Sequence, residues 1–416
     1  MPLSAAGTRL ASLDVVRGVA VLGILLLNIL SFAMPEAAYV NPRAYGGWHG
    51  ADLATWAINF VLFDGRMRGL FSFLFGASTL LVVERAEAGG RGPAGVHYRR
   101  MAWLLVFGVA HLFLVWHGDI LAHYAMMGMI AYAMRRLPVP RLLVLGAMLA
   151  LAGAILFATI PLGIVQLQAQ TPNAPALHGY AQAFGVPSPA DIAKDLALHR
   201  GSYGAILADR LREDGGALFA LFVFFGPETL GYMLFGMAAL RSGMLRGEWP
   251  RARYRRWLIA CWGIGLPAYA VPVETDSSLL PFDMRVVAAM LPLTALVRPP
   301  MIAGWICLIL LLARPDGALT ARLAAAGRMA FTNYLATSLI CTTLFYGYGL
   351  GWYGQLARWQ LYPIVFVIWA LILLWSRAWL DHFRFGPFEW LWRSLARWHL
   401  QPIRRGAPDS NASASQ

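Results

Sequence analysis

The chain has 416 residues, of which 59% are hydrophobic and only 13% are charged, and its mean hydropathy is +0.57. Soluble domains carry about 25% charged residues, so this composition excludes an ordinary soluble domain and indicates a membrane protein. The net charge of +13 does not indicate nucleic-acid binding, because the basic residues lie in short segments between apolar runs. The three cysteines lie inside apolar runs without metal-ligand spacing, so we expect buried, unpaired thiols.

Apolar runs long enough to cross a bilayer recur along the whole chain. A transmembrane helix needs about 20 apolar residues, and the chain offers about ten such runs, which predicts an all-α, polytopic transmembrane helical bundle. The predicted spans are 13–34, 66–84, 100–117, 119–135, 141–166, 217–241, 254–273, 284–313, 328–347 and 361–381. The first is too long for a signal-peptide core and is expected to be retained. Residues 48–63 have mixed polarity and are predicted to form an interfacial helix.

The eighth span is the least regular. Arg298 is followed there by Pro299 and Pro300. Proline removes a backbone donor and clashes with the preceding turn, so we expect these residues to break or kink the helix, into a short half-helix and a full helix.

Basic residues predict the orientation of the bundle. Lys and Arg gather in alternate short loops, which places both termini in the cytoplasm of a bacterial inner-membrane protein. Residues 1–397 are predicted to form a single multispan membrane domain. Within it, 166–216 form an extracytoplasmic loop in which 190–213 could make a polar helix over the outer face. Residues 398–416 are predicted to be a disordered cytoplasmic tail.

Three histidines and an aspartate lie within the apolar stretch HLFLVWHGDILAH, residues 111–123. His111 lies about 9 Å along one helix from the turn and His123 about 6 Å along the next, so the two imidazoles could share a depth below His117 and Asp119. Asp119 could simply cap the fourth span. His111 and Asp119 could instead handle protons, because histidine titrates near neutral pH and a carboxylate tunes it. A metal site is not favoured, because no close acidic or cysteine ligands accompany the histidines.

A second polar group lies near the start of the first span. Asp14 and Arg17 are three residues apart and predict an ion pair on one helix face. Asn28 follows Arg17 by about three turns and projects from the same side. The group could be an interfacial salt bridge with one helix–helix hydrogen bond, or Arg17 could receive an anionic group such as a phosphate or carboxylate.

Further polar residues lie inside the later spans. Glu228 is predicted near the middle of the sixth span beside a proline, where a buried carboxylate needs a partner or a proton and a functional role is favoured. Arg328 is predicted to open the ninth span, with Asn333 and Tyr334 a turn or more inside it. Asn333 is more commonly a helix–helix hydrogen-bonding residue than a site residue. FSFLFGAS, residues 71–78, has small residues that permit close helix contact and needs no chemistry. No Walker, HExxH or nucleophile-elbow motif is present in the sequence.

Six stretches, from about residue 10 to 397, resemble the YeiB family of bacterial membrane proteins, also called domain of unknown function 418. They are SLDVVRGVAVLGILLLNILSF, FSFLFGAS, HLFLVWHGDILAHYAMMGMI, LGYMLFGMAALRSGML, GRMAFTNYLATSLICTTLFYGYGLG and FRFGPFEWLWR. The last two are the most diagnostic. This family distantly resembles the multispan acyltransferases that include heparan-alpha-glucosaminide N-acetyltransferase.

The resemblance implies an activity and a set of site residues. Those acyltransferases move an acyl group from cytosolic acyl-CoA to an acceptor across the membrane, using a histidine. The family motifs place recurrent positions at Arg17, Asn28, His111, Gly118, Asp119, Arg328, Asn333 and Tyr334. His49 lies roughly where the acyltransferases carry their catalytic histidine.

The residues and the resemblance therefore lead to two main functional hypotheses. The first is a transmembrane acyltransferase, with His111, Asp119 and Glu228 as catalytic residues and Arg17, Asn28, Arg328, Asn333 and Tyr334 as substrate-binding residues. The second is a proton-coupled transporter or exporter of a small molecule, with Glu228 and His111 as its relay. A non-catalytic scaffold or lipid-binding protein is a third interpretation. No permanently bound cofactor or metal is expected, and acyl-CoA would be a co-substrate. The expected partners are the lipid bilayer, a small-molecule or envelope-glycan acceptor and a second copy of the chain in a homodimer, without nucleic acid.

Overall fold

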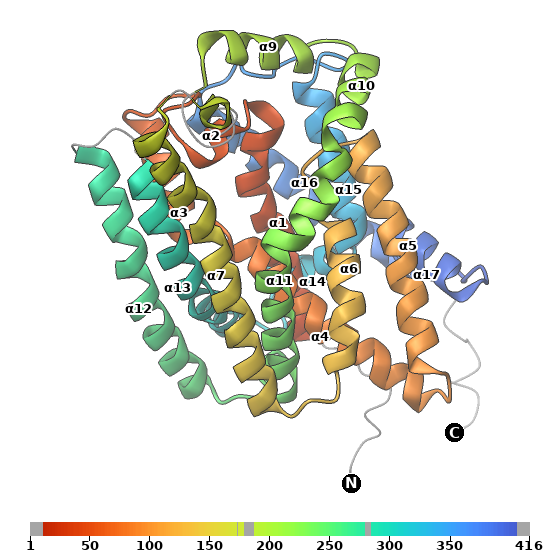
Figure 1. Cartoon of the computed structure of the whole chain (residues 1–416). Helices are drawn as coiled ribbons and strands as arrows, with labels where there is room; N and C mark the ends of the chain where they lie inside the picture. The colour runs from red at the N-terminus through yellow and green to blue at the C-terminus, as the bar shows by residue number, and fades with distance from the viewer. Residues whose placement is uncertain (1–10, 173, 179–186, 279–283, 406–416) are drawn as a thin grey trace, which may run out of the picture.

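The structure of the chain is a computed structural model that describes residues 11–172, 174–178, 187–278 and 284–405 (Figure 1). Over these residues the secondary structure is helical, apart from one isolated bridge between Phe383 and Arg404. The all-α class is therefore confirmed. Six helical segments are long and apolar enough to cross a membrane, and they are Ala11–Ala33, Ala51–Ala88, Val139–Gln170, Leu218–Arg241, Pro292–Leu312 and Arg358–His382.

Each predicted span overlaps a helix. These helices are α1 (Ala11–Ala33), α4 (Arg66–Ala88), α5 (Pro93–Leu114), α6 (Leu121–Ala131), α7 (Val139–Gln170), α11 (Ala217–Arg241), α12 (Arg251–Ser278), α13 (Met284–Leu312), α15 (Ala330–Phe345) and α16 (Leu361–His382). The remaining α-helices are α2 (Ala37–Val40), α3 (Ala51–Leu62), α9 (Pro189–His199), α10 (Tyr203–Glu213), α14 (Ala318–Arg328) and α17 (Pro387–Arg397). Since six segments meet the length and apolarity expected of a span, the count of about ten stays a prediction.

One predicted break is absent and one predicted helix boundary is wrong. α13 runs as one helix through Pro292, Pro299 and Pro300, so it is not divided into a half-helix and a full helix, and the alternative of a kink stays a prediction. Helices packed within a bundle tolerate proline, and α4, α7 and α12 all pack against α13. Arg328 ends α14 instead of opening the ninth span, because the backbone at Met329 leaves helical geometry before α15 begins.

A carboxylate from the end of the chain caps the start of α15. Glu389 in α17 accepts backbone N–H groups of Phe331 at 2.7 Å and Thr332 at 3.1 Å. An acidic group at a helix N-terminus satisfies donors that the helix leaves unpaired, so this contact fixes where α15 begins.

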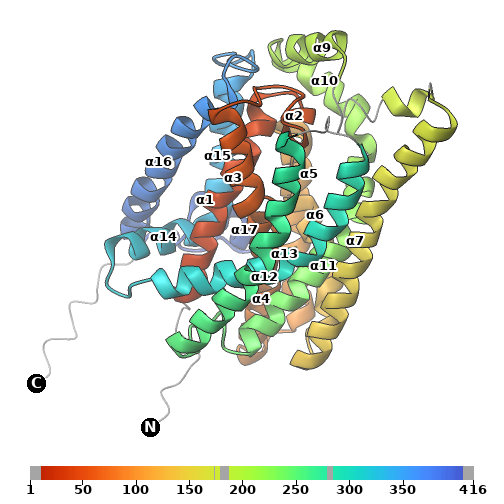
Figure 2. The same cartoon turned by 90° about the vertical axis from the view of Figure 1, so that its left-hand side faces the viewer.

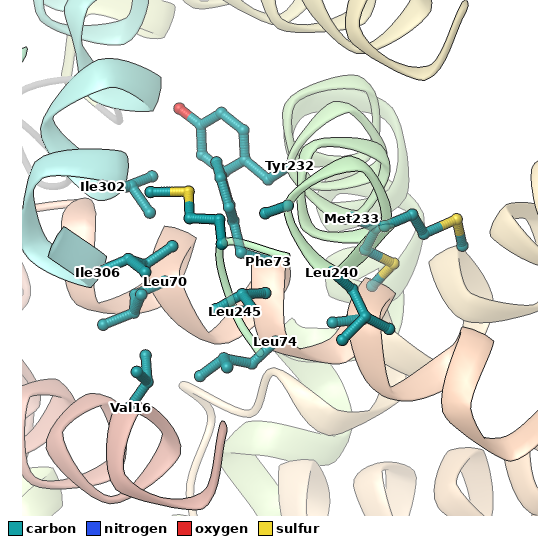
Figure 3. Close-up of a cluster of buried hydrophobic side chains, with 14 of the residues drawn as sticks. Val16, Leu70, Phe73, Leu74, Tyr232, Met233, Leu240, Leu245, Ile302 and Ile306 are labelled. Atoms are coloured by element: carbon teal, nitrogen blue, oxygen red, sulfur yellow. The ribbon is translucent and has the colours of Figure 1, made fainter. Parts of the chain in front are cut away.

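The core of the bundle forms where α4 crosses α11 (Figure 3). A Cβ added at Gly76 would run into the backbone of Met233, and one added at Gly236 would run into the backbone of Phe73. The small residues of 71–78 predicted close helix contact, and the structure has α4 crossing α11 at this place. Around it pack buried side chains from α1, α4, α11 and α13, and Figure 3 labels Val16, Leu70, Phe73, Leu74, Tyr232, Met233, Leu240, Ile302 and Ile306 among them.

α9 lies across one end of the bundle, and α10 runs from it along the neighbouring helices (Figure 1). The polar helix predicted over 190–213 is therefore two helices, with a turn at 200–202 between them. The carboxylate of Asp195 in α9 accepts the hydroxyl of Tyr353 at 2.7 Å and contacts His199 at 3.1 Å. Burial alone would raise the pKa of the Asp195 carboxyl, but these two partners hold that pKa below its ordinary value.

Arginine-rich loops meet at the end of the bundle opposite to α9 (Figure 2). Arg246, after α11, lies 3.8 Å from the carboxylate of Glu84 in α4, and Arg241 donates to backbone carbonyls in the loop before α7. The start of the predicted tail returns to the bundle, because the N–H of Arg384 donates to the carbonyl of Ile403 at 2.8 Å. The disorder predicted for 398–416 therefore does not extend to residues 398–405, and residues 406–416 lie outside the described part of the chain.

Candidate functional site

The aspartate after α5 makes the contact that each of its two predicted roles requires. One oxygen of Asp119 accepts the backbone N–H of Ala122 at 2.9 Å and caps the first turn of α6. The other oxygen lies 2.9 Å from Nδ1 of His111, near the end of α5. Both side chains are buried, with relative exposures of 3% for His111 and 4% for Asp119. A carboxylate beside Nδ1 favours the tautomer with its hydrogen on Nδ1, which would leave Nε2 as the acceptor nitrogen.

The second nitrogen of His111 is the chemically available atom of this pair. Among the described residues, Nε2 of His111 is buried and has no hydrogen-bond partner. The imidazole lies against the ring of Tyr334 in α15, with centroids 5.3 Å apart. An oriented histidine with one unoccupied basic nitrogen has the geometry of a general base.

Tyr334 also lines a small cavity between α1 and α15. Its volume is about 10 Å³, which is room for about one water molecule. Its lining residues are Val21, Ile24, Leu25, Asn28, Phe32, Tyr334, Thr337 and Ser338. The structure therefore brings Asn28, Tyr334 and His111 into one connected region.

Arg17 lies further along the same helix, toward the start of α1. Val21 lines the cavity one turn above Arg17, so the arginine belongs to the same helix face. Its guanidinium donates to Asp14 and to Ser78 at 2.9 Å each, and its side chain is 21% exposed. The predicted ion pair between Asp14 and Arg17 is confirmed, and Arg17 also joins α1 to α4.

The end of α14 lies against this part of α1. A Cβ added at Gly327 would lie 2.7 Å from the backbone nitrogen of Gly18 and would run into the carbonyl of Asp14. Arg328, the next residue, is partly buried and donates to the carbonyl of Arg384 at 3.4 Å. Arg328 therefore comes from a helix that packs directly against the helix carrying Arg17.

Asn333 joins helices and does not face the cavity. Its amide donates to the carbonyl of Ala326 at 3.0 Å and to the hydroxyl of Ser376 in α16 at 3.1 Å, and the side chain is fully buried. These contacts match the helix–helix interpretation made from the sequence. The substrate-binding role predicted for Asn333 stays a prediction.

Glu228 belongs to a different group of side chains. Its carboxylate forms ion pairs with Arg68 of α4 and Arg298 of α13, and it accepts the hydroxyl of Tyr232 at 2.8 Å. A carboxylate that binds two guanidinium groups is well satisfied as an anion and poorly suited to carrying a proton. These partners of Glu228 were not predicted from the sequence. The two arginines inside apolar runs were the signal that could have found them.

The remaining histidines do not join His111. His123 lies 2.9 Å from the hydroxyl of Thr229, beside Glu228. His117 follows Trp116, and its ring contacts that of Trp116 in the turn after α5. His49 is exposed before α3, in contact with Trp48. His111 and His123 therefore contact different neighbours, and the predicted histidine cluster is not formed.

Over the described residues, the fold and these sites define a helical protein of membrane-protein character, with helices long and apolar enough to cross a membrane and with ionisable side chains buried among them. Residues 239–399 match a family model described as "Protein of unknown function (DUF418)". The chain is 36% identical to YeiB of Escherichia coli (strain K12) over 93% of its own length and 96% of that protein. It is 32% identical to YxaH of Bacillus subtilis (strain 168), with 95% of this chain and 96% of the relative covered. A 39.9 kDa protein of Bacillus acidopullulyticus is 25% identical over 95% and 96% of the two chains. The chain belongs to the YeiB family.

Proposed function

We propose that the chain is an inner-membrane acyltransferase in which His111 is the general base. The buried pair of His111 and Asp119 carries this proposal, because Asp119 holds the hydrogen on Nδ1 and leaves Nε2 to accept a proton. The distant resemblance of the family to multispan acyltransferases supports the same class of reaction.

The reaction needs one proton acceptor and one thioester. Nε2 of His111 takes the proton from an acceptor hydroxyl or amine as the acceptor oxygen or nitrogen bonds to the thioester carbonyl carbon. The carbon–sulfur bond then breaks, and the sulfur leaves as a thiolate that takes the proton from the His111 imidazolium, which gives the free thiol and restores the neutral imidazole. Asp119 stabilises the imidazolium formed in the first step.

The donor is a cytosolic acyl thioester, with acyl-CoA as the co-substrate. Arg17 and Arg328 would contact its anionic part, and Asn28 and Tyr334 would line the path of its acyl arm. That path is about 16 Å along α1, since Arg17 and Asn28 are eleven residues apart in one helix. Glu228 would hold α4, α11 and α13 together outside this path.

Acyl transfer from labelled acyl-CoA to envelope-glycan or small-molecule acceptors in proteoliposomes tests the proposal. We expect His111→Ala to lower turnover by about 10²–10⁴-fold, the usual contribution of a positioned general base. His382→Ala is the matched control, because His382 is exposed at the end of α16 and should turn over like the parent.

Two results would contradict the proposal. Equal turnover of His111→Ala and the parent would remove His111 as the base, and loss of turnover in His49→Ala instead would move the chemistry to the exposed loop before α3. Flux of an unmodified substrate driven by a pH gradient, without acyl transfer, would favour the transporter.

A further inference from the structure

Five ionisable side chains surround the break between α3 and α4 and have no role in the proposed acyl transfer. Asp64, Arg66 and Arg68 lie at the break and in the first turn of α4, Glu228 comes from α11 and Arg298 from α13. We call this group the arginine cluster. Asp64 and Tyr269 both lie within electrostatic range of Arg66 and Arg298, which places the two arginines in one region.

The arginine cluster has more positive than negative charge. Three guanidinium groups face two carboxylates, so its formal charge is 3 − 2 = +1. Arg66 has a relative exposure of 0%, Arg298 of 6% and Glu228 of 1%. An uncompensated charge inside a protein is strongly unfavourable. Here the surrounding helices are apolar, which makes burial of the charge more costly. An additional anion would remove that imbalance.

Nitrogen atoms that could bind this anion are present. Nη1 of Arg66 donates to the carbonyls of Phe60 at 2.7 Å and Asp64 at 3.1 Å, and its guanidinium stacks 3.6 Å from the ring centre of Tyr269. Among the described residues, Nε and Nη2 of Arg66 and Nε of Arg298 are buried without a hydrogen-bond partner. Nε and Nη2 lie on one edge of a guanidinium, the edge that binds both oxygens of a carboxylate or phosphate.

The helical backbone is interrupted beside the cluster, between α3 and α4. The helix is interrupted at Phe63–Gly65, and Gly65 has a φ of +65°, where a Cβ would run into the Arg298 side chain. Interrupted helices inside bundles are tolerated where they line a polar cavity, and their half-helix N-termini attract anions. No acidic side chain lies in the first turn of α4 itself, and Asp64 lies directly before it.

Arg68 gives this region a connection to the surface. Its side chain is 21% exposed although it pairs with the buried Glu228. The guanidinium lies 5.1 Å from the ring centre of the partly exposed Phe225. Arg68 is therefore the arginine of the cluster that links Glu228 to a partly exposed position.

We propose that the arginine cluster binds one small oxyanion, a carboxylate or a phosphate group. The free edge of Arg66 holds two of its oxygens, and Arg298 and Arg68 complete the positive pocket. Glu228 shares the same two arginines and sets the affinity by competing with the ligand.

Thermal unfolding of the purified full chain in phosphatidylcholine nanodiscs tests this site, with tryptophan fluorescence as the readout. Inorganic phosphate and acetate are compared with chloride at equal ionic strength, and a parallel sample replaces part of the lipid by phosphatidylglycerol. We expect a concentration-dependent rise in Tm with an oxyanion or with the anionic lipid, because a ligand that binds only the folded state stabilises it. A response to phosphatidylglycerol alone would identify the oxyanion as the phosphate of an anionic lipid headgroup, because the phosphate of phosphatidylcholine is neutralised by its own choline.

Variants with opposite expected effects separate binding from folding. Arg66→Lys should lower the midpoint affinity for the stabilising anion at least tenfold, because the free guanidinium edge is lost. Glu228→Gln should raise that affinity, because a competing carboxylate is lost, even if the protein itself becomes less stable. Arg358→Lys is the matched control, since Arg358 is also fully buried with two unpartnered nitrogens and its partners are carbonyls of Ala38 and Tyr45.

The proposal is overturned if none of the tested anions raises Tm above chloride. It is also overturned if Arg66→Lys and Glu228→Gln keep the parent's anion affinity. Neither result depends on acyl transfer, so this test and that of the proposed function can fail separately.

Discussion

Asp119 serves the fold and the candidate site with two different oxygens. One oxygen caps α6 through Ala122, and the other contacts Nδ1 of His111. A cap of this type contributes about 0.5–2 kcal/mol, whereas orientation of a histidine affects only the reaction. The two effects can therefore be separated by substitution at one position.

Asp119→Asn should stay folded and lose its activity. Asparagine caps helices about as well as aspartate, so we expect a change in unfolding free energy below about 1 kcal/mol. The amide cannot stabilise an imidazolium, and it can donate to Nδ1 and leave the hydrogen on Nε2, so acyl transfer should fall by roughly 10² or more. Asp119→Ala should lose both the activity and the cap. Parent-like turnover of folded Asp119→Asn would show that His111 does not need this carboxylate.

Single residues differed in how far their contacts could be predicted. His111 and Asp119 are eight residues apart across one turn, so helix geometry was enough to pair them. Glu228 meets Arg68 and Arg298 from helices 160 and 70 residues away in sequence, and periodicity carries no information on such pairs. The similar depths of His111 and His123 also did not predict their contacts, because the position along a helix does not determine which neighbour a side chain faces.

At the scale of helices, the lengths of the apolar runs predicted where the helices lie. They did not predict helix ends or helix continuity that depend on contacts with other helices. The predicted spans all contain helices, because a run of about 20 apolar residues has few other stable forms in a membrane protein. The continuity of α13 through three prolines and the start of α15 under Glu389 depend on contacts with other helices. A single sequence does not reveal those contacts.

The crossing of α4 and α11 should be the least tolerant helix contact to added volume. Gly236→Leu would force a side chain into the backbone of Phe73, which the two helices can accommodate only by separating. Overpacking of this kind costs about 1–3 kcal/mol or more, so we expect a large loss of folded protein on heating in detergent. Size-exclusion chromatography after a heating series measures it.

Gly263→Ala provides the control for that crossing. Gly263 lies in α12, and nothing lies within 4 Å of a Cβ built there. Alanine favours a helix over glycine by about 1 kcal/mol, so this variant should equal or exceed the parent in stability. Comparable losses in both variants would show that α4 and α11 do not approach each other this closely.

At the scale of the whole molecule, the two ends of the bundle differ in character. α9 and α10 cover one end, and the arginine-rich loops between α4 and α5, α6 and α7, and α11 and α12 gather at the other (Figures 1 and 2). At that end Arg246 pairs with Glu84 of α4, and Arg241 donates to the carbonyl of Leu137 in the loop before α7. Because short basic loops are retained in the cytoplasm, we expect the end covered by α9 to face outward.

Cysteine accessibility in intact cells tests this orientation. Ala190, in α9, and Ala88, at the end of α4, are both exposed, whereas the three native cysteines are buried. A membrane-impermeant maleimide should label Ala190→Cys in intact spheroplasts and Ala88→Cys only after permeabilisation. In the inverted case the labels exchange, and Arg17 would then lie at the extracytoplasmic end of α1, where no cytosolic thioester could reach it. The orientation is therefore the condition under which the acyl-transfer path from Arg17 to His111 has a donor at one end and an acceptor at the other.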